Sequence, residues 1–85
     1  MPTKDNWTPL NFEDQKRKFG ERLQELRKAA GYTSAETFAN EKGFQRATYG
    51  KWEQGKYDLN IEFENILSLC NAYKITLKEL FGKGF

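Results

Sequence analysis

The chain has 85 residues, a net charge of +2, one cysteine and no histidine, so it fits a single domain around one small core. Its mean hydropathy of −0.87 indicates a large polar surface, and no stretch has the length and apolar character of a membrane span or signal peptide. Histidine, the commonest general base and metal ligand, is absent, as are nucleophile constellations and phosphate loops. We therefore expect a cytoplasmic protein that is not an enzyme and has no metal or cofactor.

The first ten residues, MPTKDNWTPL, contain two prolines and no periodicity, which predicts an irregular arm before a single domain at residues 11–85. A helix is predicted at 11–30, with Asn11 as its N-cap and Gly31 as its stop. Its apolar stripe comprises Phe12, Phe19, Leu23, Leu26 and Ala30, which recur at helical spacing.

Two short helices are predicted next, at 34–42 and 45–54. The letters TSAE, from Thr33 to Glu36, form a capping box for the first of them, which stops near Gly43. The second contains RATYGKWEQG, with Tyr49 and Trp52 on one side, and Gly55 ends it.

The last two helices are predicted at 60–73 and 76–81. Asn60 is the expected cap of the first, whose broad apolar face includes Cys70 as a buried, inert thiol. The letters TLKE, Thr76 to Glu79, are a capping box for the second. Nothing alternates with period two over a useful length, so the predicted fold is all-α with five helices.

The pair of short helices has the spacing of a helix-turn-helix. Ala39 is the small residue that a close helix crossing requires, and Gly43, four residues later, tolerates the positive φ of the turn. Phe44, Tyr49 and Trp52 then anchor the second helix in the core.

With these residues in place, the sequence resembles the phage-repressor-like (Cro/repressor, Xre-type) family of DNA-binding domains. The resemblance covers roughly residues 19–81 and is carried by FGERLQELRKAAGYT, FANEKGFQRATYGKWEQGK and ITLKELF. It implies a five-helix lambda-repressor-like fold whose helix 45–54 lies in the DNA major groove. It also implies an ion pair between Arg27 and Glu53 that locks this helix to the first one.

Carried over by position, the family pattern implies two sets of DNA contacts. Arg46 would bridge guanine O6 and N7, Lys51 would reach guanine acceptors or a phosphate, and Ala47 would meet a thymine methyl. The implied base-contacting residues are Gln45, Arg46, Ala47, Gly50 and Lys51. The implied phosphate-contacting residues are Thr33, Ser34, Gln54 and Lys56.

Two positions leave alternatives open. Gly50 either lets the helix backbone approach the groove closely or merely tolerates a short, weak helix. At the start of the second helix, where many family members have glutamine, Ser34 and Ala35 stand instead, and the segment GYTSAETFA is one residue longer than usual. The entry into that helix is therefore expected to differ.

The function that these features predict is a sequence-specific, double-stranded DNA-binding transcriptional regulator of repressor type. Ten basic and five acidic residues lie between Lys16 and Lys56, which places the positive charge where an anionic partner would bind. Specificity normally requires a dimer. The candidate dimer surface consists of the apolar residues Leu77, Leu80, Phe81 and Phe85. The alternative is that these residues close the core of the protomer. The alternative function is an antitoxin-like or accessory protein-interaction module with secondary DNA binding, which would need apolar anchors on the exposed face of residues 46–54.

Overall fold

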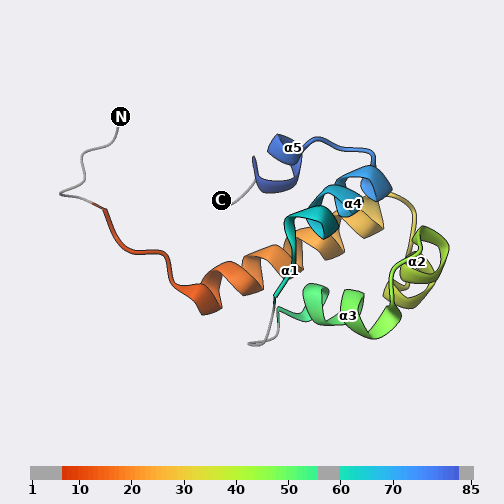
Figure 1. Ribbon diagram of the computed structural model, residues 1–85, viewed down its shortest axis with the longest axis horizontal. Coiled ribbons are helices and arrows are strands. Elements are labelled where there is room, and N and C mark those ends of the chain that lie inside the picture. Colours follow the sequence, from red (N-terminus) through yellow and green to blue (C-terminus); the bar gives the residue numbers. More distant parts are fainter. Residues whose placement is uncertain (1–6, 56–59, 83–85) are drawn as a thin grey trace.

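The computed structural model describes residues 7–55 and 60–82, and within them the chain is all-helical (Figure 1). The helices are α1 (Phe12–Ala29), α2 (Ala35–Lys42), α3 (Arg46–Gln54), α4 (Phe63–Tyr73) and α5 (Leu77–Gly82). The long α1 forms the spine of the molecule. In the view of Figure 1, α3 lies below α1 and α5 lies above it.

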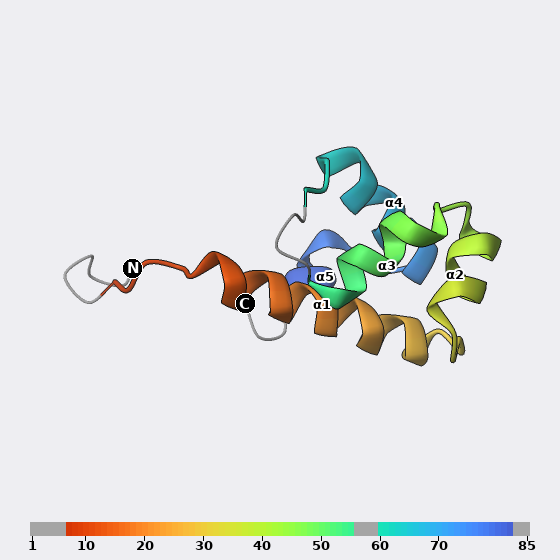
Figure 2. The ribbon, with the colours of Figure 1, turned by 90° about the horizontal axis from the view of Figure 1, so that it is seen from below.

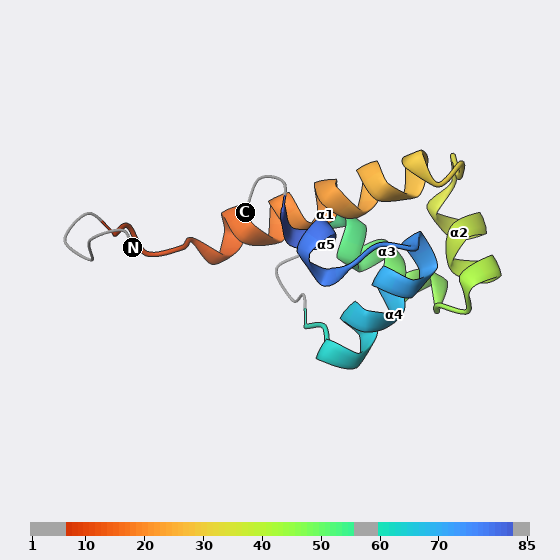
Figure 3. The same cartoon turned by 90° about the horizontal axis from the view of Figure 1, so that it is seen from above.

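Helix α1 begins and ends where its sequence predicts. The Asn11 side chain accepts a hydrogen bond from the Asp14 amide at 3.0 Å, and Gly31 beyond the last turn has a φ of 95°. The prediction that Phe12 belongs to the apolar stripe is wrong, because its side chain is 60% exposed. The first turns of α1 project beyond the other helices, so no partner helix covers this residue (Figures 2 and 3).

The backbones of α1 and of α3 with the residue after it approach so closely at two glycine positions that a side chain would not fit there. A Cβ atom at Gly20 of α1 would overlap the backbone carbonyl of Glu53 in α3. At Gly55, just after α3, a Cβ would lie 2.8 Å from the Lys16 carbonyl oxygen. Backbone-to-backbone packing at both points fixes where α3 lies against α1.

The core is built largely from aromatic rings contributed by α1 to α4. Phe38 is fully buried, and its ring centroid lies 5.1 Å from that of Tyr49 and 5.0 Å from that of Tyr73. The two tyrosine hydroxyl groups share a buried hydrogen bond of 2.6 Å. Burial raises the pKa of both phenols well above their ordinary value, so they pack as neutral groups. This pair ties α3 to α4.

The turn between α2 and α3 confirms the predicted roles of Ala39 and Gly43. Ala39 is fully buried, and Gly43 adopts a left-handed φ of 82°. The capping box predicted at Thr33 is wrong by one residue. Ser34 is the N-cap, and its hydroxyl oxygen accepts from the Thr37 amide at 3.2 Å. Glu36 is then the second residue of α2 and not the third, which is the capping-box position, and it pairs with Arg46 instead.

Helices α4 and α5 complete the fold with one wrong cap and one confirmed cap. Asn60 does not cap α4, because α4 begins only after Glu62, which has the extended backbone of an N-cap, and Ile61 between them packs on the core. The capping box of α5 is confirmed. The Thr76 amide donates to the Glu79 carboxylate at 2.9 Å, and the Glu79 amide donates to the Thr76 hydroxyl at 3.1 Å. These hydrogen bonds lower the pKa of the Glu79 carboxyl.

Candidate nucleic-acid interface

Helix α3 has two faces of opposite character. Tyr49 is fully buried, Trp52 is 4% exposed, and the Glu53 carboxylate lies buried beside them. Trp52 packs edge-on against Phe44, with 5.9 Å between the ring centroids. The other face of α3 points to solvent on the underside of the molecule, as Figure 2 shows. Its exposed residues include the predicted DNA-contacting positions Gln45, Arg46, Ala47, Lys51 and Gln54, with Gly50 half-buried among them.

A buried ion pair fixes the inner face of α3 to α1, as the family resemblance implies. The Arg27 Nε atom lies 2.7 Å from one Glu53 carboxylate oxygen, and its Nη2 atom lies 3.1 Å from the other. The hydrogen bond with Glu53 raises the pKa of Arg27. A third donor of the same guanidinium, Nη1, binds the Tyr32 carbonyl oxygen at 3.1 Å. Arg27 thereby links α1, α3 and the segment that leads into α2.

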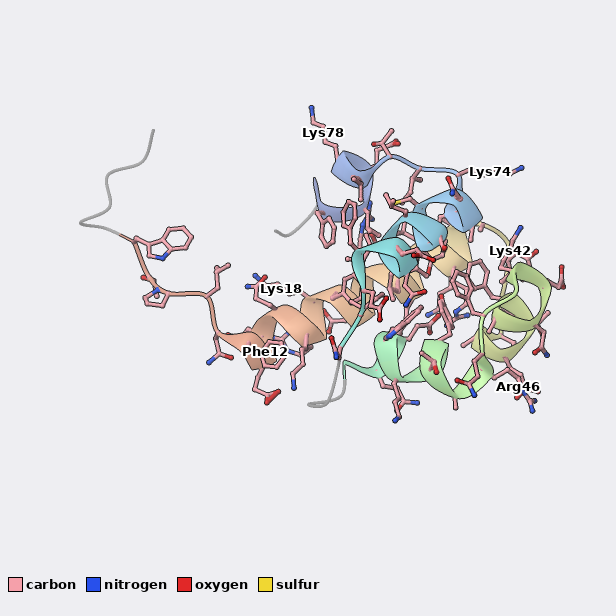
Figure 4. The ribbon with its side chains drawn as sticks, viewed as in Figure 1. Phe12, Lys18, Lys42, Arg46, Lys74 and Lys78 are labelled. Atoms are coloured by element: carbon pink, nitrogen blue, oxygen red, sulfur yellow. The ribbon has the colours of Figure 1, made fainter. Side chains whose placement is uncertain are left out.

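On the outer face, the first residue of α3 pairs with the first turn of α2. The Arg46 Nη1 atom lies 2.8 Å from a Glu36 carboxylate oxygen, and the two side chains are 59% and 64% exposed. Figure 4 places Arg46 at the edge of the molecule where α2 meets α3. No periodic pattern signals this contact, because Glu36 and Arg46 are ten residues apart and belong to different helices.

Gln45 is the N-cap residue of α3, but its side chain makes no capping hydrogen bond. Its side-chain oxygen accepts from the Thr48 hydroxyl at 2.6 Å, and its backbone carbonyl accepts from the Tyr49 amide at 2.9 Å. The two N–H groups of its side-chain amide take no part in these bonds. Gln45 therefore keeps its donors beside Arg46, at the end of α3 where the helix N-terminus faces solvent.

The predicted phosphate-contacting residues lie at the start of α2 and the end of α3. Thr33 is exposed, and Ser34 is half-buried because its oxygen caps α2. The Ser34 hydroxyl keeps a proton to donate, and the nearby helix N-terminus favours anions. Lys56 lies outside the described residues.

Half of the ten basic residues from Lys16 to Lys56 form ion pairs within the protein. Within the described ranges, ion pairs involve the basic residues Lys16, Arg17, Arg22, Arg27 and Arg46. Arg22 also donates to the Leu80 and Glu79 carbonyl oxygens at 3.1 and 2.6 Å, which attaches α5 to α1. The count of charges therefore overstates the field that α3 presents. Lys74 and Lys78 lie on the opposite side of the molecule (Figure 4).

Gly50 is not required by the packing of the protein itself. A Cβ atom built at this position meets no other atom within 4 Å, so a methyl group would point into open space. This contrasts with Gly20, a close-contact glycine that the sequence analysis did not single out. The space over Gly50 is compatible with a groove-bound α3, and both readings of this residue remain predictions.

The predicted apolar dimer surface is wrong for Leu80, which is fully buried within the protomer. The Phe81 ring is half-buried and stacks on Phe19 with 6.1 Å between centroids. Both residues close the core because α5 folds back onto α1. Leu77 is 37% exposed, and Phe85 lies outside the described residues. The broad apolar face predicted for α4 is not fully buried, because Phe63 is 62% exposed and Leu67 is 40% exposed.

Comparisons with known proteins match this chain to a helix-turn-helix family and to two control proteins. A family model described as helix-turn-helix matches residues 23–80. The chain is 37% identical over 69 residues to control protein C.MunI from Mycoplasma sp, a match that covers 81% of this chain and 90% of that protein. It also resembles the crystal structure of the restriction-modification controller protein C.AhdI from Aeromonas hydrophila. That match has a TM-score of 0.69 and 43% identity, and covers 80% of this chain and 98% of the other.

None of the helices in the described residues is long and apolar enough to cross a membrane. Nor do the residues at 7–55 and 60–82 contain a group of three or more cysteine, aspartate or glutamate side chains placed to hold a metal ion.

Proposed function

This chain belongs to the helix-turn-helix family of sequence-specific DNA-binding transcriptional regulators, and from that premise we propose how and where it binds DNA. Helix α3 enters the major groove with its solvent-facing side toward the base edges. The observation that carries this proposal is the division of α3, whose inner face is buried in the core while its outer face is polar and exposed.

The outer face has the residue types that base recognition requires. Arg46 binds guanine through O6 and N7, Gln45 donates its amide N–H groups to base or phosphate acceptors, and Ala47 contacts a thymine methyl. Lys51 reaches a guanine or a phosphate from the next turn. Gly50 has no side chain between the α3 backbone and the base edges, so it allows close approach.

Phosphate contacts hold α3 in register. The Thr33 and Ser34 hydroxyl groups and the amides that open α2 bind one strand, while Gln54 and Lys56 bind beyond the end of α3. These contacts make the affinity fall as salt concentration rises, since bound cations leave the DNA when the protein binds.

We propose that the DNA sites bound by this protein regulate the transcription of restriction-modification genes. Both relatives are control proteins by name, one of them of a restriction-modification system, and their matches span most of this chain. The same role makes this chain a cytoplasmic protein that acts on DNA without catalysing a reaction.

We propose that it binds as a homodimer on two half-sites about 34 to 36 Å apart. Of the predicted apolar surface, Leu77 is still exposed in the protomer, and we add Phe63 and Leu67, which lie one turn apart on the exposed side of α4. Exposed apolar side chains that lie close together on one surface are candidates for a subunit contact. Phe63→Ser with Leu67→Ser should convert the dimer to a monomer in sedimentation, whereas Trp7→Ser, another exposed apolar site, should leave its mass unchanged.

The alternative of a protein-interaction module finds no support on α3. A protein-binding face needs exposed aromatic or apolar anchors, and the aromatic residues of α3, Tyr49 and Trp52, are buried.

Selection of bound sequences from a random pool of double-stranded DNA tests the proposal. We expect enrichment of a two-fold symmetric site with half-sites one helical turn, or a multiple of it, apart. Failure to enrich any sequence would contradict the proposed function. An enriched single half-site would retain DNA recognition and contradict the dimer.

A further inference from the structure

The ion pair between Glu36 and Arg46 places a negative charge on the surface that the proposed function assigns to DNA. Glu36 lies in the first turn of α2, close to where phosphate groups are expected, and its carboxylate oxygen is 2.8 Å from the Arg46 Nη1 atom. An acidic side chain at this position repels the DNA backbone. Its presence there calls for a physical reason.

The ion pair itself adds little to folding stability. The side chains of Glu36 and Arg46 are 64% and 59% exposed. Ion pairs with this exposure contribute little to stability, because water screens the charges and two long side chains lose freedom. By contrast, the buried pair of Arg27 and Glu53 holds α1 and α3 together.

The geometry of the guanidinium indicates what the pair does. Arginine has five N–H donors in a rigid, planar fork. When Glu36 binds at Nη1, the donors on Nε and Nη2 remain directed along another edge of that plane. Two parallel hydrogen bonds to guanine O6 and N7 need such an edge, held in the plane of the base.

We propose that Glu36 is a positioning residue that orients Arg46 for a guanine and so determines how strongly this base pair is discriminated. The inference rests on the proposed function, because it needs Arg46 to read a base. Glu36 orders the long Arg46 side chain before DNA is bound, which lowers the entropy lost on binding. It also weakens binding to sites where Arg46 finds no guanine, because there its repulsion of phosphate is not offset.

The test measures dissociation constants for the selected site and for the same site with the guanine replaced, using full-length protein. Glu36→Ala should lower the preference for guanine by roughly 3- to 10-fold, the cost of ordering one long side chain on binding. It should also bind unrelated DNA more tightly than the original protein does. Glu36→Gln keeps an oxygen that accepts from Arg46, so its preference for guanine should fall less.

A double-mutant cycle separates positioning from an independent contact. In an Arg46→Ala background, Glu36→Ala should cause no further loss of discrimination. Glu41→Ala is the matched control, since Glu41 is an exposed carboxylate of the same helix that accepts from the Tyr32 hydroxyl at 3.0 Å. It should leave the preference for guanine unchanged, and all variants should melt within a few degrees of one another.

Two results would overturn the inference while leaving the proposed function intact: an unchanged guanine preference in Glu36→Ala, or an equal loss with and without Arg46. If the original protein selects no DNA sequence at all, the proposed function fails first. The inference then fails with it.

Discussion

The two faces of α3 are built under different constraints. On the inner face, each large side chain has a fixed neighbour: Trp52 packs on Phe44, the Tyr49 hydroxyl binds that of Tyr73, and Glu53 pairs with Arg27. On the outer face, side chains are exposed, and the glycine has open space above it. Truncation of inner side chains should therefore lower the free energy of unfolding, and truncation of outer side chains should mainly change DNA binding.

The strongest test of the inner face is Trp52→Ala. Trp52 is 4% exposed, and truncation of a buried aromatic residue typically removes about 3 to 5 kcal/mol of stability. A small domain has about 5 to 15 kcal/mol in total, so much of the fold stability should be lost, and DNA binding with it. Urea denaturation followed by circular dichroism measures this change. A loss under about 1 kcal/mol would show that the ring is not a core anchor.

Arg27→Met should be almost as damaging, because it leaves the Glu53 carboxylate buried without its partner. Breaking one half of such a pair costs roughly 3 kcal/mol or more. The double variant with Arg27→Met and Glu53→Leu removes both charges, and its unfolding free energy should recover toward that of the original protein. If the double variant is no more stable than Arg27→Met alone, the pair does not act as a unit.

Arg46→Ala should show the opposite behaviour. The unfolding free energy should change by less than about 0.5 kcal/mol, since the Arg46 side chain is 59% exposed. Discrimination at one base pair should fall by roughly 1 to 3 kcal/mol. Mobility-shift titrations with single-base variants of the selected site measure it. Lys78→Ala, which removes an exposed charge on α5, is the control. Equal losses for both variants would place the DNA contact elsewhere.

Gly50→Ala is the mildest change and separates the two readings of this residue. A methyl group at position 50 meets no neighbour, so replacing a helical glycine should raise stability by about 0.5 to 1 kcal/mol. Close approach predicts that DNA binding weakens at the same time. Raised stability with unchanged affinity would show that glycine is merely tolerated there.

The sequence was informative where one residue type satisfies a local requirement. Gly43 was predictable from the left-handed turn it makes, and Ala39 from the helix crossing that leaves room only for a small side chain. The capping box at Thr76 was equally readable, because all its hydrogen bonds lie within four residues. The Arg27 and Glu53 pair came instead from the family resemblance, since no local pattern joins residues 26 positions apart.

The features that the sequence did not predict depend on how the helices are placed relative to one another. Thr33 and Ser34 both satisfy a cap pattern, and only the entry angle of α2 selects Ser34. Phe12 continues the apolar spacing of α1 beyond the last helix that covers it. The Glu36 contact with Arg46 joins two helices whose relative placement the sequence does not state. Within the candidate site, sequence could therefore name the residues of α3 but not their partners.

The most direct test of the account maps DNA contact residue by residue. Nuclear magnetic resonance of the labelled protein, titrated with its selected site, reports a shift for each backbone amide. We expect the largest changes at residues 45–51 and at Thr33 and Ser34, with little change in the exposed amides of α5. Large changes confined to α4 and α5, with residues 45–51 unaffected, would contradict the assignment of the outer face of α3 to DNA.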